Sequence, residues 1–211
     1  MKEKFKNYIR QDAVFDKSTW IGIFCLIIVI AGIFGFLYEF IFYYFNSGMK
    51  QFYYRGGNFL PWINIYAIGA ILIFFLTYKK RKNPLFVFVV SVISTGILEY
   101  IAGFFMEHIM QVKCWDYSNK ILSFGNINGY VCLRSVLVFG VSSLLLIYFI
   151  VPFCFSLAKK MKTKHFLIMS YTLCAIFLFD ELYNLIFARI FSLPRASEVY
   201  QKLGVPYLYF N

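Results

Sequence analysis

Five long apolar runs separated by short polar segments dominate the hydropathy pattern of this chain. A helix needs about 20 apolar residues to cross the roughly 30 Å hydrocarbon core of a bilayer, and runs of this kind are typical of membrane-spanning helices. The pattern therefore predicts an all-α, polytopic transmembrane helical bundle. We expect five spans within a single membrane domain, residues 20–193, at about residues 20–45, 60–78, 85–110, 130–158 and 165–193.

The basic residues predict how this bundle is oriented. Lysine and arginine gather in the tail before the first span and in the short segments 79–82 and 159–164, thirteen in all, whereas the two opposite loops hold four. Basic residues are retained on the cytoplasmic side of a membrane. We therefore expect a cytoplasmic basic amino-terminal tail over residues 1–19 and an outer-face tail over residues 194–211.

Composition narrows the range of functions. The 211 residues are 61% hydrophobic with a mean hydropathy of +0.68, which leaves no room for a sizeable soluble domain. No Walker A pattern is present, so P-loop nucleotide hydrolysis by this chain is excluded. The net charge of +11 lies mainly at membrane edges, so the expected partner is the lipid bilayer and no nucleic acid.

Acidic residues in or beside the apolar runs are the strongest indication of a functional site. A carboxylate in hydrocarbon costs several kcal/mol unless it is paired, hydrated or protonated, so such residues indicate function by default. Six of the ten acids belong to this group, and the predicted topology places all six on the outer side: Glu39, Glu99, Glu107, Asp116, Asp180 and Glu181.

Spacing within the runs supports a common polar site. Thr95, Glu99 and Gly103 recur every four residues, with Glu107 continuing the series, so they share one helix face. Arg134, near the outer start of the fourth run, is the expected counter-ion. One arginine cannot neutralise several acids, which predicts an outward-facing acidic cavity where the others are hydrated, protonated or bound to a cation. The alternative is that these residues form structural pairs that pin helices together.

Histidine and cysteine give no metal-binding pattern. His108 follows Glu107, but the other histidine, His165, is predicted on the opposite side of the membrane. We therefore expect no metal site and no cofactor. Cys114 and Cys132 both belong near the outer face, and the sequence leaves open whether they are bonded to each other.

Several short motifs in residues 30–150 resemble a known family. They are Gly35-Phe36-Leu37-Tyr38-Glu39, Pro61 to Tyr66 with Gly69, Glu99-Tyr100-Ile101-Ala102-Gly103 with Glu107, Trp115-Asp116-Tyr117-Ser118, Gly125-Asn126-Ile127-Asn128-Gly129 and Cys132 to Ser135. In this order they resemble the bacterial family described as "Putative ABC-transporter type IV", or CmpB-like. Asn64-Ile65-Tyr66-Ala67 departs from the Pro-Ile-Tyr-Gly type of segment expected there. The resemblance implies a permease in a bacterial cell membrane, an ATPase subunit on another chain and a homo-oligomer.

Three functions remain open at this stage. A transport or permease component would bind a cation, a proton or a basic solute. An intramembrane acid–base enzyme would act on a lipid or isoprenoid substrate. An assembly subunit would bury its acids against a partner chain. The candidate substrate-binding residues are Glu39, Glu99, Asp116, Arg134 and Asp180, with Glu107, Trp115, Tyr117 and Asn128 beside them.

Overall fold

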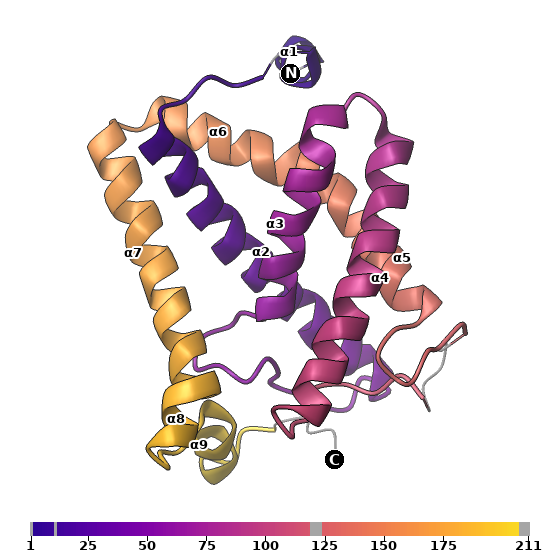
Figure 1. The fold of residues 1–211 in the computed structure, drawn as a ribbon. Helices are drawn as coiled ribbons and strands as arrows, with labels where there is room; N and C mark the ends of the chain where they lie inside the picture. Colours follow the sequence, from indigo (N-terminus) through magenta and orange to yellow (C-terminus); the bar gives the residue numbers. More distant parts are fainter. Residues whose placement is uncertain (1, 11, 119–123, 207–211) are drawn as a thin grey trace. The chain divides into compact units, whose positions relative to one another are not determined.

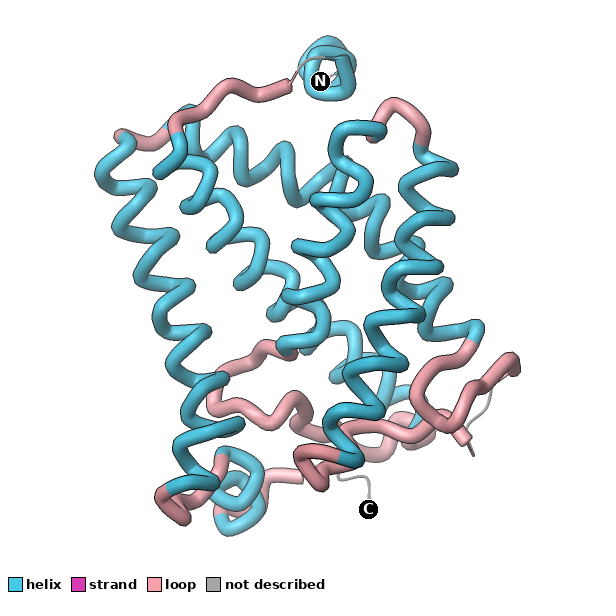
Figure 2. The backbone as a smooth tube through the Cα atoms, viewed as in Figure 1, coloured by secondary structure: helices cyan, strands magenta, loops and turns pink. Residues whose placement is uncertain are grey.

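The computed structural model describes residues 2–10, 12–118 and 124–206, and in these ranges the chain is helical with connecting loops and no strand (Figure 2). The predicted all-α fold class is confirmed. The helices are α1 (Lys2–Arg10), α2 (Lys17–Asn46), α3 (Asn64–Thr77), α4 (Pro84–His108), α5 (Leu133–Leu145), α6 (Val151–Lys160), α7 (Thr163–Leu182), α8 (Ala188–Ile190) and α9 (Ala196–Lys202) (Figure 1). A 3₁₀ turn (Tyr78–Lys80) extends α3, and π turns join α5 to α6 (Leu146–Ile150) and α7 to α8 (Tyr183–Phe187).

Four helical stretches among the described residues are long and apolar enough to cross a membrane. They are Lys17–Asn46, Pro84–His108, Leu133–Lys160 and Thr163–Ile190. The chain is therefore a membrane protein whose helices contact lipid. Pro152 does not end the third of these stretches, because helical structure continues to Lys160. A π turn (Leu146–Ile150) ends shortly before Pro152, whose ring nitrogen has no N–H to donate to the helix.

The remaining predicted span, residues 60–78, is shorter in the structure than expected. Its helix α3 begins at Asn64 and has 14 residues, about 21 Å at 1.5 Å per residue. The residues before Asn64 make other backbone contacts: the Ile63 N–H donates to the carbonyl of Gly32 at 3.0 Å. The Leu60 N–H donates to the carboxylate of Asp180 at 2.9 Å. These tertiary hydrogen bonds draw residues 60–63 away from a helical path.

The chain divides into two compact units. The first contains the described residues up to Asp16 together with Gly69–Leu157, and the second contains Lys17–Ile68 with the described residues from Ala158 onward.

In the first unit α4 and α5 lie side by side (Figure 1). Close packing of these helices depends on small residues, since a Cβ on Gly140 would lie 2.7 Å from Phe88 and Val92. Buried residues recur every four positions along α4, at Val87, Ser91, Thr95, Glu99 and Gly103. Three of them, Thr95, Glu99 and Gly103, are on the face that the sequence predicted, whereas Glu107, expected to continue it, is only partly buried.

Arg81 ties the amino-terminal segment to the first unit. Its side chain is 3% exposed, donates to the carbonyl of Tyr8 at 3.0 Å and pairs with Asp12 at 3.0 Å. The Tyr8 hydroxyl donates in turn to the carbonyl of Ile147. Residues 2–10 of the predicted basic tail thus form a helix with defined contacts.

In the second unit α2 packs against α7. Loop 47–63 and helix α9 belong to the same unit. Its core includes Val29, Trp62, Ala67 and Phe177. The carboxyl-terminal tail belongs here: the Tyr200 hydroxyl of α9 donates to the carbonyl of Phe59 at 2.6 Å. The last part of the predicted tail, residues 207–211, lies outside the described residues.

Cys114 and Cys132, both in the described part of the chain, are not joined by a disulfide. Cys132 is instead the N-cap residue of α5.

Gly35 gives a test of the packing between α2 and α3. A Cβ at this position would lie 2.2 Å from the Tyr66 ring, whereas a Cβ on Gly69 would meet its nearest neighbour at 3.7 Å. We expect Gly35→Ala to lower the free energy of unfolding by about 1–3 kcal/mol through overpacking. Gly69→Ala, the matched control, is expected to be neutral or to gain up to about 1 kcal/mol from helix propensity. Thermal unfolding in detergent micelles measures both, and equal effects would contradict the packing described here.

Candidate functional site

Glu99 is the most enclosed acidic side chain of the first unit. It lies on the buried face of α4 with 3% of its surface exposed. The Tyr117 hydroxyl donates to its Oε1 at 2.9 Å, and the Ser135 hydroxyl donates to its Oε2 at 2.6 Å. A buried carboxylate requires such hydrogen bonds, because burial removes its water. Three segments distant in sequence therefore meet at this carboxylate.

The start of α5 explains why Ser135 reaches Glu99. Cys132 is the N-cap residue, and Ser135 sits in the first helical turn with its hydroxyl accepting from the Cys132 N–H at 3.2 Å. This is the reciprocal half of a capping box, and it fixes the Ser135 side chain. The same hydroxyl has the Cys132 carbonyl at 2.9 Å as a second acceptor for its single proton.

Arg134 approaches Glu99 through Tyr117. Its guanidinium carbon lies 5.4 Å from the centre of the Tyr117 ring, within the range of a cation–π contact. Tyr117 therefore contacts the cation through its ring and the carboxylate through its hydroxyl. The first unit thus brings together three of the residues that the sequence singled out.

Asp116 and Glu107 gather around Lys113. The Lys113 ammonium lies 2.7 Å from Asp116 Oδ2 and 3.9 Å from Glu107 Oε1. The hydrogen bond from Lys113 is the main reason why the pKa of Asp116 falls from its ordinary 3.8 to about 2. The same bond raises the pKa of Lys113 above its ordinary value. Asp116 is therefore an ionised, paired residue of the loop.

Trp115 and Asn128 both hold this loop in place. The Trp115 indole N–H donates to the carbonyl of Tyr130 at 2.8 Å, and the Asn128 amide donates to the Tyr100 hydroxyl at 3.0 Å. Gly129 follows in the left-handed region, with φ +76°, and a Cβ there would lie 2.7 Å from Asp116. This close approach requires glycine.

In the second unit Asp180 holds loop 47–63 against α7. Its carboxylate accepts from the N–H groups of Phe59 at 3.0 Å and Leu60 at 2.9 Å, and from the Asn184 amide at 2.8 Å. The side chain is buried, and every one of these partners is a nitrogen that can only donate. Asp180 thus anchors the backbone of the loop.

Glu181, the next residue, is bound by side-chain amides. Asn58 donates to Oε1 at 2.7 Å and Asn64 donates to Oε2 at 3.0 Å. The sequence interpretation missed both asparagines as partners. Their presence as isolated amides at the border of an apolar run was the signal that could have identified them.

Glu39 forms an ion pair with Arg55 at 2.8 Å, and both side chains are largely buried. The Tyr66 hydroxyl adds a longer hydrogen bond of 3.4 Å, and the guanidinium lies 4.6 Å from the centre of the Tyr43 ring. Arg55 is a third partner that the sequence interpretation missed. The sequence placed it in an outer loop, but in this aromatic, glycine-containing loop Arg55 serves as an internal counter-ion.

The candidate residues thus fall into two groups, one in each unit. The second unit contains Glu39 and Asp180. The first unit contains the other seven: Glu99, Glu107, Asp116, Arg134, Trp115, Tyr117 and Asn128. Within the described residues no three His, Cys, Asp or Glu side chains are arranged to hold a metal ion. A single cavity shared by all the acids stays a prediction.

The family described as "Putative ABC-transporter type IV" matches residues 26–185, well over half of the chain. No curated protein and no solved structure matched.

Asp180 and Glu181 differ in how they should tolerate loss of charge. Asp180→Asn replaces one acceptor oxygen with a donor that faces a backbone N–H. A backbone N–H, unlike a side-chain amide, cannot rotate to present an acceptor in its place. We expect a loss of about 1–3 kcal/mol in the free energy of unfolding. Glu181→Gln should cost less, because the amides of Asn58 and Asn64 can rotate to present an oxygen. Thermal unfolding in micelles compares the two variants, and an equal or larger cost for Glu181→Gln would contradict this account.

The lowered pKa of Asp116 predicts a pH dependence of stability. The unfolded chain binds a proton near pH 3.8 and the folded chain near pH 2, so the stabilisation is present above about pH 4 and is lost as the pH falls toward 2. Unfolding followed between pH 6 and pH 2 should show a steeper loss for the wild type than for Asp116→Asn. Lys113→Ala should remove the difference as well. Parallel curves for all three proteins would show that the pair contributes nothing.

Proposed function

Because the chain belongs to the family described as "Putative ABC-transporter type IV", we propose that it is a membrane-embedded transport component in which Glu99 binds a proton or a cationic solute. Its lack of a P-loop motif means that ATP hydrolysis would come from an ATPase on another chain. The proposal includes a second copy of the chain, since a transport pathway built from so few helices is incomplete. The membrane would be that of a bacterial cell.

The partners of Glu99 are the observation that carries this proposal. Tyr117 and Ser135 contact it through hydroxyl groups, which can donate to a carboxylate or accept from a protonated carboxyl group. Asp180, by contrast, is contacted by N–H groups that only donate. Glu99 can therefore gain and lose a proton, or exchange a proton for another cation, without losing both hydrogen bonds.

Arg134 and the loop acids would set the charge around this site. Arg134 places its guanidinium over the ring of Tyr117, and Asp116 and Glu107 lie around Lys113, so cationic and anionic side chains both stand near the Glu99 site. We assign Glu39 and Asp180 a structural part in this scheme, because an ion pair and backbone donors already satisfy them.

The proposal also keeps five spans with a cytoplasmic amino terminus. Helix α3 with its 3₁₀ extension covers Asn64–Lys80, about 27 Å at 1.5 Å per α-helical and 2.0 Å per 3₁₀ residue, close to the hydrocarbon thickness. With α3 as a span, the basic segments 79–82 and 159–164 come to the same side of the membrane as the amino-terminal tail.

An intramembrane enzyme acting on a lipid or isoprenoid is the alternative. The observation in its favour is the 2.6 Å contact between the Ser135 hydroxyl and Glu99, which provides a hydroxyl with an adjacent base. Asp116 does not suit the role of general acid, because its pKa of about 2 keeps it ionised. Product formed from a bacterial lipid extract by the purified chain would favour this alternative.

Uptake by membrane vesicles tests the transport proposal. Vesicles from cells producing the chain are supplied with protons, sodium, potassium, magnesium and basic amino acids, with and without ATP. We expect Glu99→Gln to reduce uptake of the transported ion or solute by at least about tenfold, since each 1.4 kcal/mol of lost binding is tenfold.

Glu181→Gln is the matched control, because it neutralises a partly buried acid of another spanning helix, and the amide partners of Glu181 tolerate the change. It should retain uptake. Wild-type uptake by a folded Glu99→Gln variant would reject the role given to Glu99.

A further inference from the structure

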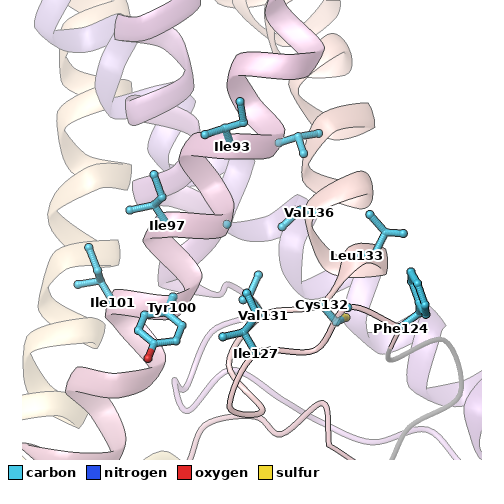
Figure 3. Close-up of a pocket in the computed structure, with 13 residues that line it drawn as sticks. Ile93, Ile97, Tyr100, Ile101, Phe124, Ile127, Val131, Cys132, Leu133 and Val136 are labelled. Atoms are coloured by element: carbon cyan, nitrogen blue, oxygen red, sulfur yellow. The ribbon is translucent and has the colours of Figure 1, made fainter.

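An apolar groove runs along α4 in the first unit, apart from the Glu99 site. It has a volume of about 580 Å³ and lies between residues 92–101 of α4 and the segment 124–136, which includes the start of α5. Figure 3 shows Ile93, Ile97 and Ile101 along one wall, with Ile127, Val131 and Val136 across from them. We call this the α4–α5 groove.

We propose that the α4–α5 groove binds one hydrocarbon chain of a bilayer lipid, taken from the leaflet next to the carboxyl end of α4. The inference does not depend on transport, because it rests on the shape and chemistry of the groove alone.

The chemistry of the lining fits only an apolar occupant. Among the described residues no charged side chain lines the groove, and the polar side-chain atoms there are the Tyr100 hydroxyl and the Cys132 thiol. Figure 3 shows the Tyr100 oxygen at the loop end of the groove. A hydrocarbon chain removes this apolar lining from contact with polar groups at no cost in unpaired hydrogen bonds.

The groove is continuous with the lipid-facing surface of a spanning helix. Ile93, Ile97 and Ile101 form one row on α4, and each is more than half exposed. Pro84–His108 is one of the four membrane-spanning stretches, so bilayer hydrocarbon lies against this row. The occupant that the membrane supplies is therefore an acyl chain.

The length of the groove matches one leaflet. Residues 92–101 of α4 extend over about 14 Å, roughly half of the 30 Å hydrocarbon core. The Asn128 amide donates to the Tyr100 hydroxyl at 3.0 Å at the loop end. An acyl chain entering there would place its ester and headgroup beside these two polar side chains and its tail along the isoleucine row.

Gly96 gives the groove its depth. A Cβ at this position would lie 3.1 Å from Val136 and 3.8 Å from Val131, so any side chain here enters the groove between its two walls. A large side chain introduced at position 96 would therefore fill the groove.

Lipid retention tests the proposal. The full chain is reconstituted with phosphatidylethanolamine and phosphatidylglycerol, extracted, washed in detergent and weighed by native mass spectrometry. We expect one phospholipid to remain per wild-type chain and Gly96→Phe to lose it. Ile97→Ala, which removes lining without crowding, should reduce retention several-fold and keeps the test valid if Gly96→Phe does not fold.

Ile168→Ala is the control, since Ile168 on α7 is 55% exposed against 57% for Ile97 and lies outside the groove. It should retain lipid as the wild type does. A phospholipid with a diazirine at the end of its acyl chain should, on irradiation, label residues 92–101 and 124–136. Unchanged retention in folded Gly96→Phe and Ile97→Ala would overturn the proposal, and so would crosslinks between the groove residues of two chains, which would show that a second copy occupies it.

Discussion

The cost of a carboxylate inside an apolar bundle is the constraint on which this structure depends. Four acids of the helices and their flanking loops offset this cost, each with a different kind of hydrogen-bond partner. Glu39 has a guanidinium, Asp180 has backbone N–H groups, Glu181 has side-chain amides and Glu99 has hydroxyls. These partners differ in whether they can accept as well as donate: the backbone N–H groups at Asp180 and the guanidinium at Glu39 only donate, whereas the hydroxyls at Glu99 can do both.

Asp180 shows how such a requirement shapes the backbone. Its carboxylate accepts from the N–H groups of Phe59 and Leu60, which places the residues before Asn64 against α7 and delays the start of α3. A buried acid therefore defines where a neighbouring helix begins. The hydrogen bonds of the loop and the length of α3 are two consequences of one interaction.

Local patterns in the sequence predicted local features of the structure. The four-residue repeat through Thr95, Glu99 and Gly103 identified the buried face of α4, because helix periodicity alone determines which residues share a face. The four long spans follow from the length and hydropathy of their runs. Arg134, predicted as a counter-ion from its position at the start of a helix, lies over the ring of Tyr117, whose hydroxyl donates to Glu99.

Partners that depend on tertiary contacts were not readable in the same way. Arg55 lies in a loop with no periodicity, so nothing in the sequence distinguishes a buried counter-ion there from a solvated one. The roles of Asn58 and Asn64 follow only once loop 47–63 folds against α7. The start of α3 likewise depends on Asp180, more than a hundred residues away in the chain.

The central claim is that Glu99, held by two hydroxyls, exchanges a proton within the bilayer. Infrared difference spectroscopy of the reconstituted protein tests it most directly, because a protonated carboxyl group has a carbonyl stretch that a carboxylate lacks. The account predicts such a band that appears reversibly on acidification and is absent from Glu99→Gln. A band that is unchanged in Glu99→Gln, or no titrating band in the wild type, would contradict it.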